Sequence, residues 1–191
     1  MSILALDGLH VGDLELRRTR RPIELLDIAT LYRTSFPFTE RRTVESMAQY
    51  LTLPSVCFYR LFRSDSCVGM LHLWILEHVV YGEHFAIEPH FRNQGYGRQI
   101  LRMVLDNLEK PILIEVEPPE NELAARRLNF YEREGLFVAQ KDYIQPPYQS
   151  ASAEVALYLL SNEPNTETLH LTNTIAELRE VVYHCPDSIN K

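Results

Sequence analysis

The chain has 191 residues, a formal net charge of −7, 46% hydrophobic residues and 24% charged residues. This length predicts one globular domain, and the composition excludes a disordered chain, which would be less hydrophobic and more charged. The acidic balance argues against nucleic-acid binding, because the neutralisation of phosphates requires Lys and Arg. It is compatible with a cationic partner such as an amine.

Apolar runs, the N-terminal residues and the cysteines indicate the expected cellular compartment. No apolar run approaches the ~20 residues that a membrane-spanning helix needs, so no membrane association is expected. Residues 1–10 contain no basic segment followed by a long apolar run, so no signal peptide is expected. The three cysteines, Cys57, Cys67 and Cys185, are widely spaced and form no C-x-x-C motif. This pattern predicts a reducing, cytoplasmic location.

Apolar periodicity and turn residues predict the helices and strands. The predicted elements, in chain order, are a strand at 14–19, helices at 22–36 and 42–51, strands at 56–62, 67–77 and 81–87, a helix at 95–110, a strand at 112–116, a helix at 120–134, strands at 138–144 and 154–160, and a last helix at 173–183. Thr39 is expected to cap the second helix. Pro89 and Pro111 end the elements that precede them, since proline has no backbone N–H to donate.

The middle of the chain predicts the topology. A strand, an amphipathic helix and a short apolar strand follow one another over 81–116. Such a unit places its two strands parallel, because the helix carries the chain back to the end of the sheet at which the first strand began. The hairpins around it predict antiparallel neighbours. The fold class is therefore mixed α/β, with a mostly antiparallel sheet, a central parallel pair and flanking helices.

One segment suggests an anion site at a helix start. Residues 84–100 read HFAIEPHFRNQGYGRQI, so a strand and a short polar loop lead into a helix at Arg92-Asn93-Gln94-Gly95-Tyr96-Gly97. The first N–H groups of a helix carry partial positive charge, and glycines let an anion approach them. The segment lacks the third glycine of the dinucleotide fingerprint and the G-K-[ST] of a Walker A loop. On the glycines alone, a plain turn before a packed helix remains an equal alternative.

The wider pattern resembles a known family. The R-x-x-G-x-G sequence after the strand is similar to motif A of the GNAT acetyltransferases, and Phe130-Tyr131-Glu132-Arg133-Glu134-Gly135-Leu136-Phe137 resembles the family's F-Y-x-x-x-G-F segment. The resemblance covers about residues 13–161 and predicts a GNAT domain over 1–162. Residues 163–191 then form a C-terminal extension with a helix, which packs on the domain or pairs two subunits as a homodimer.

The resemblance implies acetyl-CoA as co-substrate, and it implies which residues bind it. The backbone of Phe85, Ala86 and Ile87 would pair with the pantetheine arm. The acetyl group would lie where the strands at 81–87 and 112–116 splay apart. The loop that would wrap the pyrophosphate consists of Arg92, Asn93, Gln94, Gly95, Tyr96, Gly97 and Arg98. The family often has an asparagine seven residues before its tyrosine, where this chain has Ala124, and Asn121 or the Arg126-Arg127 pair could take its place.

The resemblance also implies the catalytic groups. Tyr131 matches the family's tyrosine general acid, which protonates the leaving thiolate; the alternative is a residue that packs at the end of a helix stripe. Glu83 lies where many members have a carboxylate base, and burial is expected to raise its pKa toward neutrality; an equal alternative is a solvent-facing residue at the sheet edge. Glu115 and Glu117 alternate along one face and are rival bases or cation-binding groups; an equal alternative is that both lie past the sheet edge in water.

The expected acceptor is a primary amine of a small molecule or a peptide, cationic in solution. Tyr143 and Tyr148, which flank Gln145-Pro146-Pro147, would border its site beside the carboxylates, because a tyrosine face can hold an ammonium group. The histidines at 72, 78, 84 and 90 are separated by turns and show no metal-binding spacing, so no metal is expected. The segment from Ile114 onward resembles a bacterial GNAT subgroup of undefined substrate. The alternative function is a GNAT-fold module that binds an acyl-CoA or a partner without turnover.

Overall fold

The computed structural model describes residues 6–148 and 154–184. The first five residues, in which no signal peptide is expected, and Cys185 lie outside this range. The helices and strands of the described part are β1 His10–Val11, β2 Leu14–Arg18, η1 Pro22–Asp27, α1 Ala29–Ser35, η2 Phe38–Glu40, α2 Val44–Tyr50, β3 Val56–Arg63, β4 Ser66–Ile75, β5 Val80–Ile87, η3 Pro89–Phe91, α3 Tyr96–Asn107, β6 Ile112–Val116, α4 Glu122–Arg133, β7 Phe137–Gln145, β8 Val155–Ser161, α5 Leu171–Glu177 and η4 Leu178–Val182.

The strands form a mixed sheet in the order β1-β2-β3-β4-β5-β6-β8-β7. Among the strands described, β5 and β6 form the one parallel pair, as the strand–helix–strand unit predicts. The chain divides into two compact units, with residues 1–75 and 82–109 in the first and residues 76–81 and 110–191 in the second. Strand β5 therefore begins in the second unit and continues in the first. These units do not correspond to the predicted GNAT domain and C-terminal extension, and the predicted boundary at residue 162 stays a prediction.

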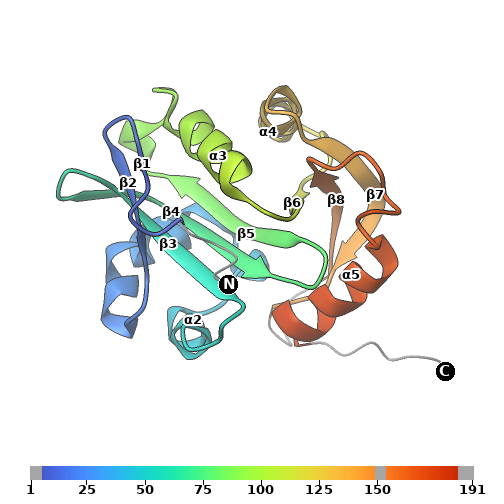
Figure 1. Cartoon of the computed structure of the whole chain (residues 1–191), viewed down its shortest axis with the longest axis horizontal. Coiled ribbons are helices and arrows are strands. Elements are labelled where there is room, and N and C mark those ends of the chain that lie inside the picture. The colour runs from blue at the N-terminus through green and yellow to red at the C-terminus, as the bar shows by residue number, and fades with distance from the viewer. Residues whose placement is uncertain (1–5, 149–153, 185–191) are drawn as a thin grey trace. The chain divides into compact units, whose positions relative to one another are not determined.

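In the first unit, strands β1 to β4 form an antiparallel meander that places β4 beside β5. Helix α3 lies on one side of these strands, and α1 and α2 lie on the other (Figure 1). A Cβ atom at Gly69 of β4 would lie 2.7 Å from the Ala86 carbonyl oxygen. Glycine therefore permits the close approach of β4 to the end of β5, the part of the strand expected to bind pantetheine.

In the second unit, β8 pairs antiparallel with both β6 and β7, and Glu115 of β6 lies opposite Leu159 of β8. The start of β5 joins this unit, since the Val80 N–H donates to the Pro111 carbonyl at 2.8 Å. Helix α5 also packs within it, because the Glu177 carboxylate accepts the Glu77 N–H at 3.0 Å. The predicted extension thus packs on its own chain, one of the two arrangements left open.

Three predicted helices differ in detail from the structure. Residues 22–36 form a 3₁₀ turn followed by α1, and the break falls at the buried Ile28, with a φ of −112°. Thr43, not Thr39, caps α2, and its side chain accepts the Ser46 N–H. The last helix ends in the π-helical turn η4. At Ile28, packing of a buried side chain overrides the local helix propensity.

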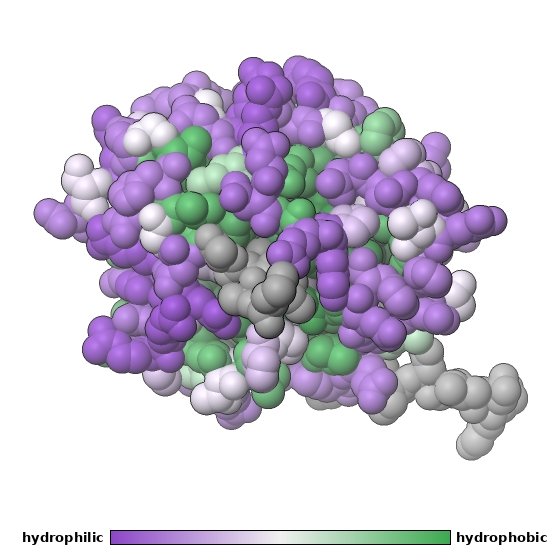
Figure 2. Space-filling view, viewed as in Figure 1, coloured by the Kyte–Doolittle hydropathy of each residue, from purple (hydrophilic) through white to green (hydrophobic). Residues whose placement is uncertain are grey.

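The surface and the core follow the composition. Hydrophilic residues cover most of the face visible in Figure 2, as the net charge leads one to expect. The largest fully buried side chains of the described residues include Trp74, Tyr32, Tyr59 and Tyr81. Among the described residues, no helix combines the length and apolar character that crossing a bilayer would require.

Candidate active site

The predicted anion loop begins α3 in the expected way. Gly95 is the N-cap residue of α3 and has a φ of 83°, a left-handed conformation that glycine adopts without strain. The first intrahelical bond runs from the Gln99 N–H to the Gly95 carbonyl at 3.0 Å. The N–H groups of Tyr96 and Gly97 precede that bond, so they lie at the positive end of the helix dipole. This geometry suits a phosphate group.

Side chains around the loop fix its shape. The Arg92 Nε donates to the Ile87 carbonyl at 2.7 Å, and the Gln94 amide donates to the His90 carbonyl at 2.8 Å. Asn93 has a φ of 60°, a conformation that asparagine tolerates better than most residues. The Arg92 side chain thus ties the loop to the end of β5, while the side chain of Tyr96 is buried. The backbone of the loop remains the part suited to an anion.

Strand β5 carries the residues expected to pair with pantetheine. Phe85 is half-buried, whereas Ala86 and Ile87 are buried. The Glu88 N–H donates to the Val68 carbonyl at 2.9 Å, so β4 holds the end of this strand. The first unit therefore brings the predicted residues of β5 and the loop at 92–98 into one continuous strand–loop–helix segment.

Glu83 of β5 is an ion-paired group inside the first unit. Its side chain is 1% exposed, and the Arg42 guanidinium donates to its Oε1 at 2.9 Å. The Trp74 indole N–H donates to its Oε2 at 2.9 Å. The Arg42 guanidinium also lies over the rings of Trp74 and Tyr50. Both oxygens of Glu83 are therefore engaged by buried donors.

The pKa of Glu83 corrects one expectation from the sequence. Burial alone raises the pKa of this carboxyl, but the Arg42 charge, with His84 and the hydrogen bonds from His84 and Trp74, outweighs it. The pKa therefore lies well below its usual range rather than near neutrality. No sequence pattern identified Arg42 as the partner, since 41 residues separate the two in the chain.

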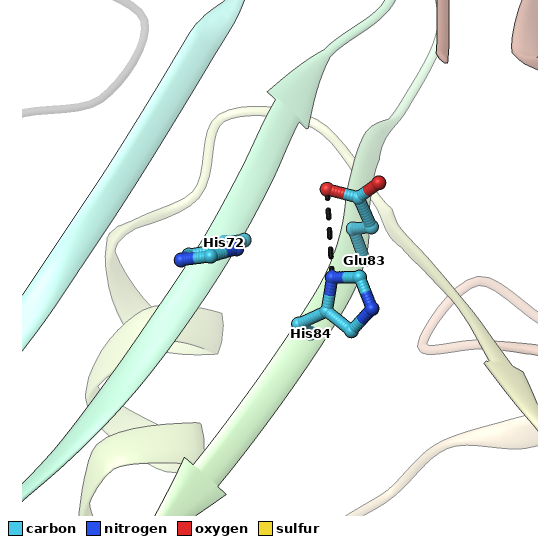
Figure 3. A group of neighbouring side chains, drawn as sticks. All are labelled: His72, Glu83 and His84. Carbon is cyan, nitrogen blue, oxygen red and sulfur yellow. Dashed lines mark ion pairs between the residues drawn. The ribbon is translucent and has the colours of Figure 1, made fainter. Parts of the chain in front are cut away.

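His72 of β4 lies beside Glu83 and His84 of β5 (Figure 3), and one nitrogen or oxygen atom of each side chain lies within 4.8 Å of the others. His84 Nε2 donates to the Glu40 carbonyl at 2.9 Å, and burial, with a contribution from His84, lowers the pKa of His72 to about 3. His72 and His84 come from neighbouring strands, and their ring centroids are 5.8 Å apart. A metal ion here would face the Arg42 guanidinium, so this cluster is poorly suited to a cation.

Glu115 of β6 lies among tyrosines in the second unit. The Tyr183 hydroxyl donates to both of its oxygens, at 2.9 and 2.8 Å, and the Gln145 amide donates to Oε2. The Tyr81 and Tyr183 hydroxyl oxygens are 2.8 Å apart. Burial raises the pKa of Glu115, although hydrogen bonds from the surrounding tyrosines and Gln145 oppose the rise. Among the described residues, no cation forms an ion pair with this carboxylate in the structure.

The two tyrosines predicted to border the acceptor site lie beside this cluster. Tyr143 is buried next to Glu115, and burial, followed by the charge of that carboxylate, raises the pKa of Tyr143 well above its usual range. The ring centroids of Tyr148 and Tyr183 are 5.0 Å apart. The structure therefore gathers Glu115, Tyr143 and Tyr148, as the sequence suggests, and adds Tyr81 and Tyr183.

Glu117 and Tyr131 both interact with Arg127 of α4. Glu117 forms an ion pair with Arg127 of α4, and its side chain is 38% exposed. Tyr131, also on α4, is half-buried. Burial, and to a smaller extent Glu117, raises the pKa of Tyr131 to about 12, although Arg127 opposes the rise. Its hydroxyl is therefore protonated at neutral pH. Asn121 caps α4 by accepting the Ala124 N–H at 2.9 Å, a role that engages its side-chain oxygen.

The sequence missed Arg42, Trp74, Tyr81 and Tyr183. None of the four lies in a motif: Trp74 and Tyr81 meet their carboxylates from neighbouring strands, Arg42 from the loop before α2, and Tyr183 from the C-terminal extension. A single arginine or tyrosine carries no local signal, so only the folded chain reveals these partners.

Comparisons with known proteins agree with this arrangement. The chain matches the model of the acetyltransferase (GNAT) family over residues 25–136. A protein from Bacteroides thetaiotaomicron assigned to the GNAT acetyltransferases has 30% identity and a TM-score of 0.80, over 88% of this chain and 98% of that one. No curated protein sequence matches the chain significantly.

Two more distant structures share the fold. The ribosomal-protein-S18-alanine N-acetyltransferase from Escherichia coli has 17% identity and a TM-score of 0.58, over 77% of this chain and 92% of its own. Arabidopsis thaliana Naa50, in complex with the bisubstrate analogue CoA-Ac-MVNAL, has 19% identity and a TM-score of 0.57, over 78% of this chain and 98% of its own. The family match spans more than half of the chain, and with the 30% identical relative it shows that this protein belongs to the GNAT family of acetyltransferases.

Proposed function

We propose that the protein transfers an acetyl group from acetyl-CoA to a primary amine of a small molecule or a peptide, in the cytoplasm. The observation that carries the proposal is the segment in which β5, the loop at 92–98 and α3 meet, with Gly95 as a left-handed N-cap. Two matched proteins support the cofactor. A GNAT acetyltransferase from Elizabethkingia anophelis was solved with acetyl-CoA bound, and Naa50 was solved with a CoA analogue.

The reaction needs a proton acceptor and a proton donor. A cationic amine first loses one proton to a base, and its nitrogen then bonds to the thioester carbonyl carbon. The C–S bond breaks, the nitrogen loses its second proton and the thiolate gains one, so one proton is released overall. Tyr131 is our candidate for the donor, because its raised pKa keeps the phenol protonated and its position matches the family's acid.

Two observations support Glu115 over Glu83 as the base. Glu83 is locked to Arg42, and its lowered pKa makes it a weak proton acceptor. Glu115 has a raised pKa, which lies closer to that of an efficient base at neutral pH. We propose that Glu115 accepts the proton, and that Glu83 keeps its charge and organises the interior of the first unit. Because Arg127 offsets the charge of Glu117, we propose Glu117 only as a secondary group for binding a cationic acceptor.

A screen for thiol release tests the proposal. Purified protein is incubated with acetyl-CoA and a panel of small amines and peptides, and free CoA thiol is followed. We expect turnover with at least one cationic primary amine. The Tyr131→Phe variant should lose ~10²-fold in kcat, with unchanged acetyl-CoA affinity, because its hydroxyl acts as the thiolate leaves. Acetyl-CoA binding without turnover on any acceptor would favour the non-catalytic module instead.

A matched pair of variants distinguishes the roles of Glu115 and Glu83. Glu115→Gln should lose at least ~10²-fold in kcat, because the amide cannot accept a proton. Glu83→Gln should retain most of its kcat, provided that its fold, checked by circular dichroism, is intact. The opposite ranking of the two variants would return the role of base to Glu83.

A further inference from the structure

The C-terminal extension brings Tyr183 to Glu115. Tyr183 directly follows the π-helical turn η4, and its N–H donates to the Leu178 carbonyl at 3.1 Å. It lies beyond the residues that match the family model, which end at 136. A π-turn is rare and occurs often at functional sites. Here it ends α5 where a tyrosine reaches the carboxylate.

The direction of the hydrogen bonds follows from the number of protons. Each phenol has one proton, and an ionised carboxylate can only accept. When Glu115 is ionised, Tyr183, which lies within hydrogen-bond distance of both carboxylate oxygens, donates to it. The Tyr81 hydroxyl contacts both the Tyr183 oxygen and Glu115, so its one proton has two acceptors within this cluster.

The groups that face Glu115 come from several elements. Tyr81 lies on β5, Tyr143 and Gln145 lie on β7, and Tyr183 lies after η4. The Arg179 charge opposes the rise in the pKa of Tyr143, and the Tyr148 ring contacts the Tyr183 ring. Because the Tyr183 hydroxyl lies within hydrogen-bond distance of both oxygens of Glu115, it fixes the orientation of the carboxylate as well as its environment.

We propose that Tyr183 is a positioning residue for the general base: the C-terminal extension supplies a hydroxyl that holds Glu115 ionised and oriented to take the proton of the amine. This inference rests on the function proposed above. It gives the extension a part in the reaction that the family match does not contain.

The Tyr183 hydroxyl should affect the pKa of Glu115 in a defined direction. A hydrogen bond to the ionised form lowers a pKa, and Tyr183 acts on Glu115 in this direction, against burial. Loss of the hydroxyl should therefore raise the pKa of Glu115 further. Because the base must be ionised, the acidic limb of the pH–rate profile should move to higher pH. The loss of a hydrogen bond to a charged group shifts the pKa of that group by about one to two units.

The experiment compares Tyr183→Phe with the parent and with Tyr158→Phe. Tyr158 lies on β8 in the same unit, with its ring beside the Lys141 ammonium, so it controls for the loss of a phenol. The profile of kcat/KM against pH is measured for each protein. We expect the acidic limb of Tyr183→Phe alone to move up by about one unit or more, and its rate to recover at high pH.

A second readout does not depend on turnover. Carbon-13 NMR of labelled glutamate carboxyls, with Glu115 assigned by Glu115→Gln, gives its pKa directly in the parent and in Tyr183→Phe. An upward shift supports the proposal, and an unchanged pKa overturns it. A shift in the NMR pKa without any shift in the profile would instead overturn Glu115 as the base. A rate loss in Tyr183→Phe that does not recover at high pH would show a merely structural role.

Discussion

At the level of single residues, the two strand carboxylates Glu83 and Glu115 have opposite surroundings. Glu83 faces the Arg42 guanidinium and an indole N–H, whereas Glu115 faces tyrosine hydroxyls and an amide. A fixed cation lowers a carboxyl pKa, while neutral donors only partly offset the effect of burial. The pKa values of two glutamates on neighbouring strands are thus shifted in opposite directions.

The Arg42–Glu83 pair should matter for stability. Arg42→Met leaves a buried carboxylate without its cation, so it should lower the free energy of unfolding by ~3–5 kcal/mol in urea titrations at pH 7. Because the pKa of Glu83 is lowered in the folded state, the pair stabilises the protein above the unfolded pKa of this group. That stabilisation disappears as the pH falls through the folded pKa.

The controls for this prediction lie in the same unit. Arg33→Met, on the exposed side of α1, should stay within ~0.5 kcal/mol of the parent. The double variant Arg42→Met/Glu83→Gln should recover part of the loss, since it removes the unpaired charge. A loss in Arg42→Met no larger than that in Arg33→Met would mean that the pair contributes nothing.

At the level of elements, the start of α3 is the part of the chain best matched to a phosphate. Helix α3 has 12 residues, so its dipole is well developed, and Gly95 turns the chain into it with positive φ. A Cβ at Gly95 would lie 3.7 Å from the Gln99 side-chain nitrogen, an ordinary contact. Substitution there acts through backbone strain and through the space that the ligand needs, not through a clash with the protein.

Gly95→Val should therefore weaken acetyl-CoA binding by at least ~2 kcal/mol, about 30-fold in Kd, as measured by calorimetry. Gly8→Val is the matched control. Gly8 also has a positive φ, of 76°, with no atom within 4 Å of the position that a Cβ would take, and it lies in the same unit. It should lose comparable stability but keep the parent's affinity. Equal affinities for both variants would remove the loop from the cofactor site.

At the level of the whole molecule, the net charge of −7 favours the approach of a cation. Salt screens this attraction, so added salt should raise the KM of a cationic acceptor and leave kcat nearly unchanged. Steady-state kinetics between low and physiological ionic strength measure the effect. An uncharged osmolyte at equal osmolarity should leave KM unchanged. A KM that is indifferent to salt would mean that the overall field plays no part in acceptor binding.

The sequence by itself determined the order of most elements and the family. Periodicity and prolines locate β5, α3 and β6 to within a few residues, because one face of each must be apolar to form a core. Short contiguous motifs carry their own signal, so R-x-x-G-x-G and the segment around Tyr131 could be recognised without a structure. The sequence placed Gly95 at the start of α3, whereas its left-handed N-cap conformation is a finding of the structure.

Only the tertiary structure decided the partners of each carboxylate. Arg42 meets Glu83 across 41 residues and Tyr183 meets Glu115 across 68, and no periodic pattern links residues so far apart. The sequence could place both glutamates on strands but could not say which would face a cation. That difference sets the direction of their pKa shifts, because the Arg42 charge outweighs burial at Glu83, whereas the neutral donors around Glu115 do not.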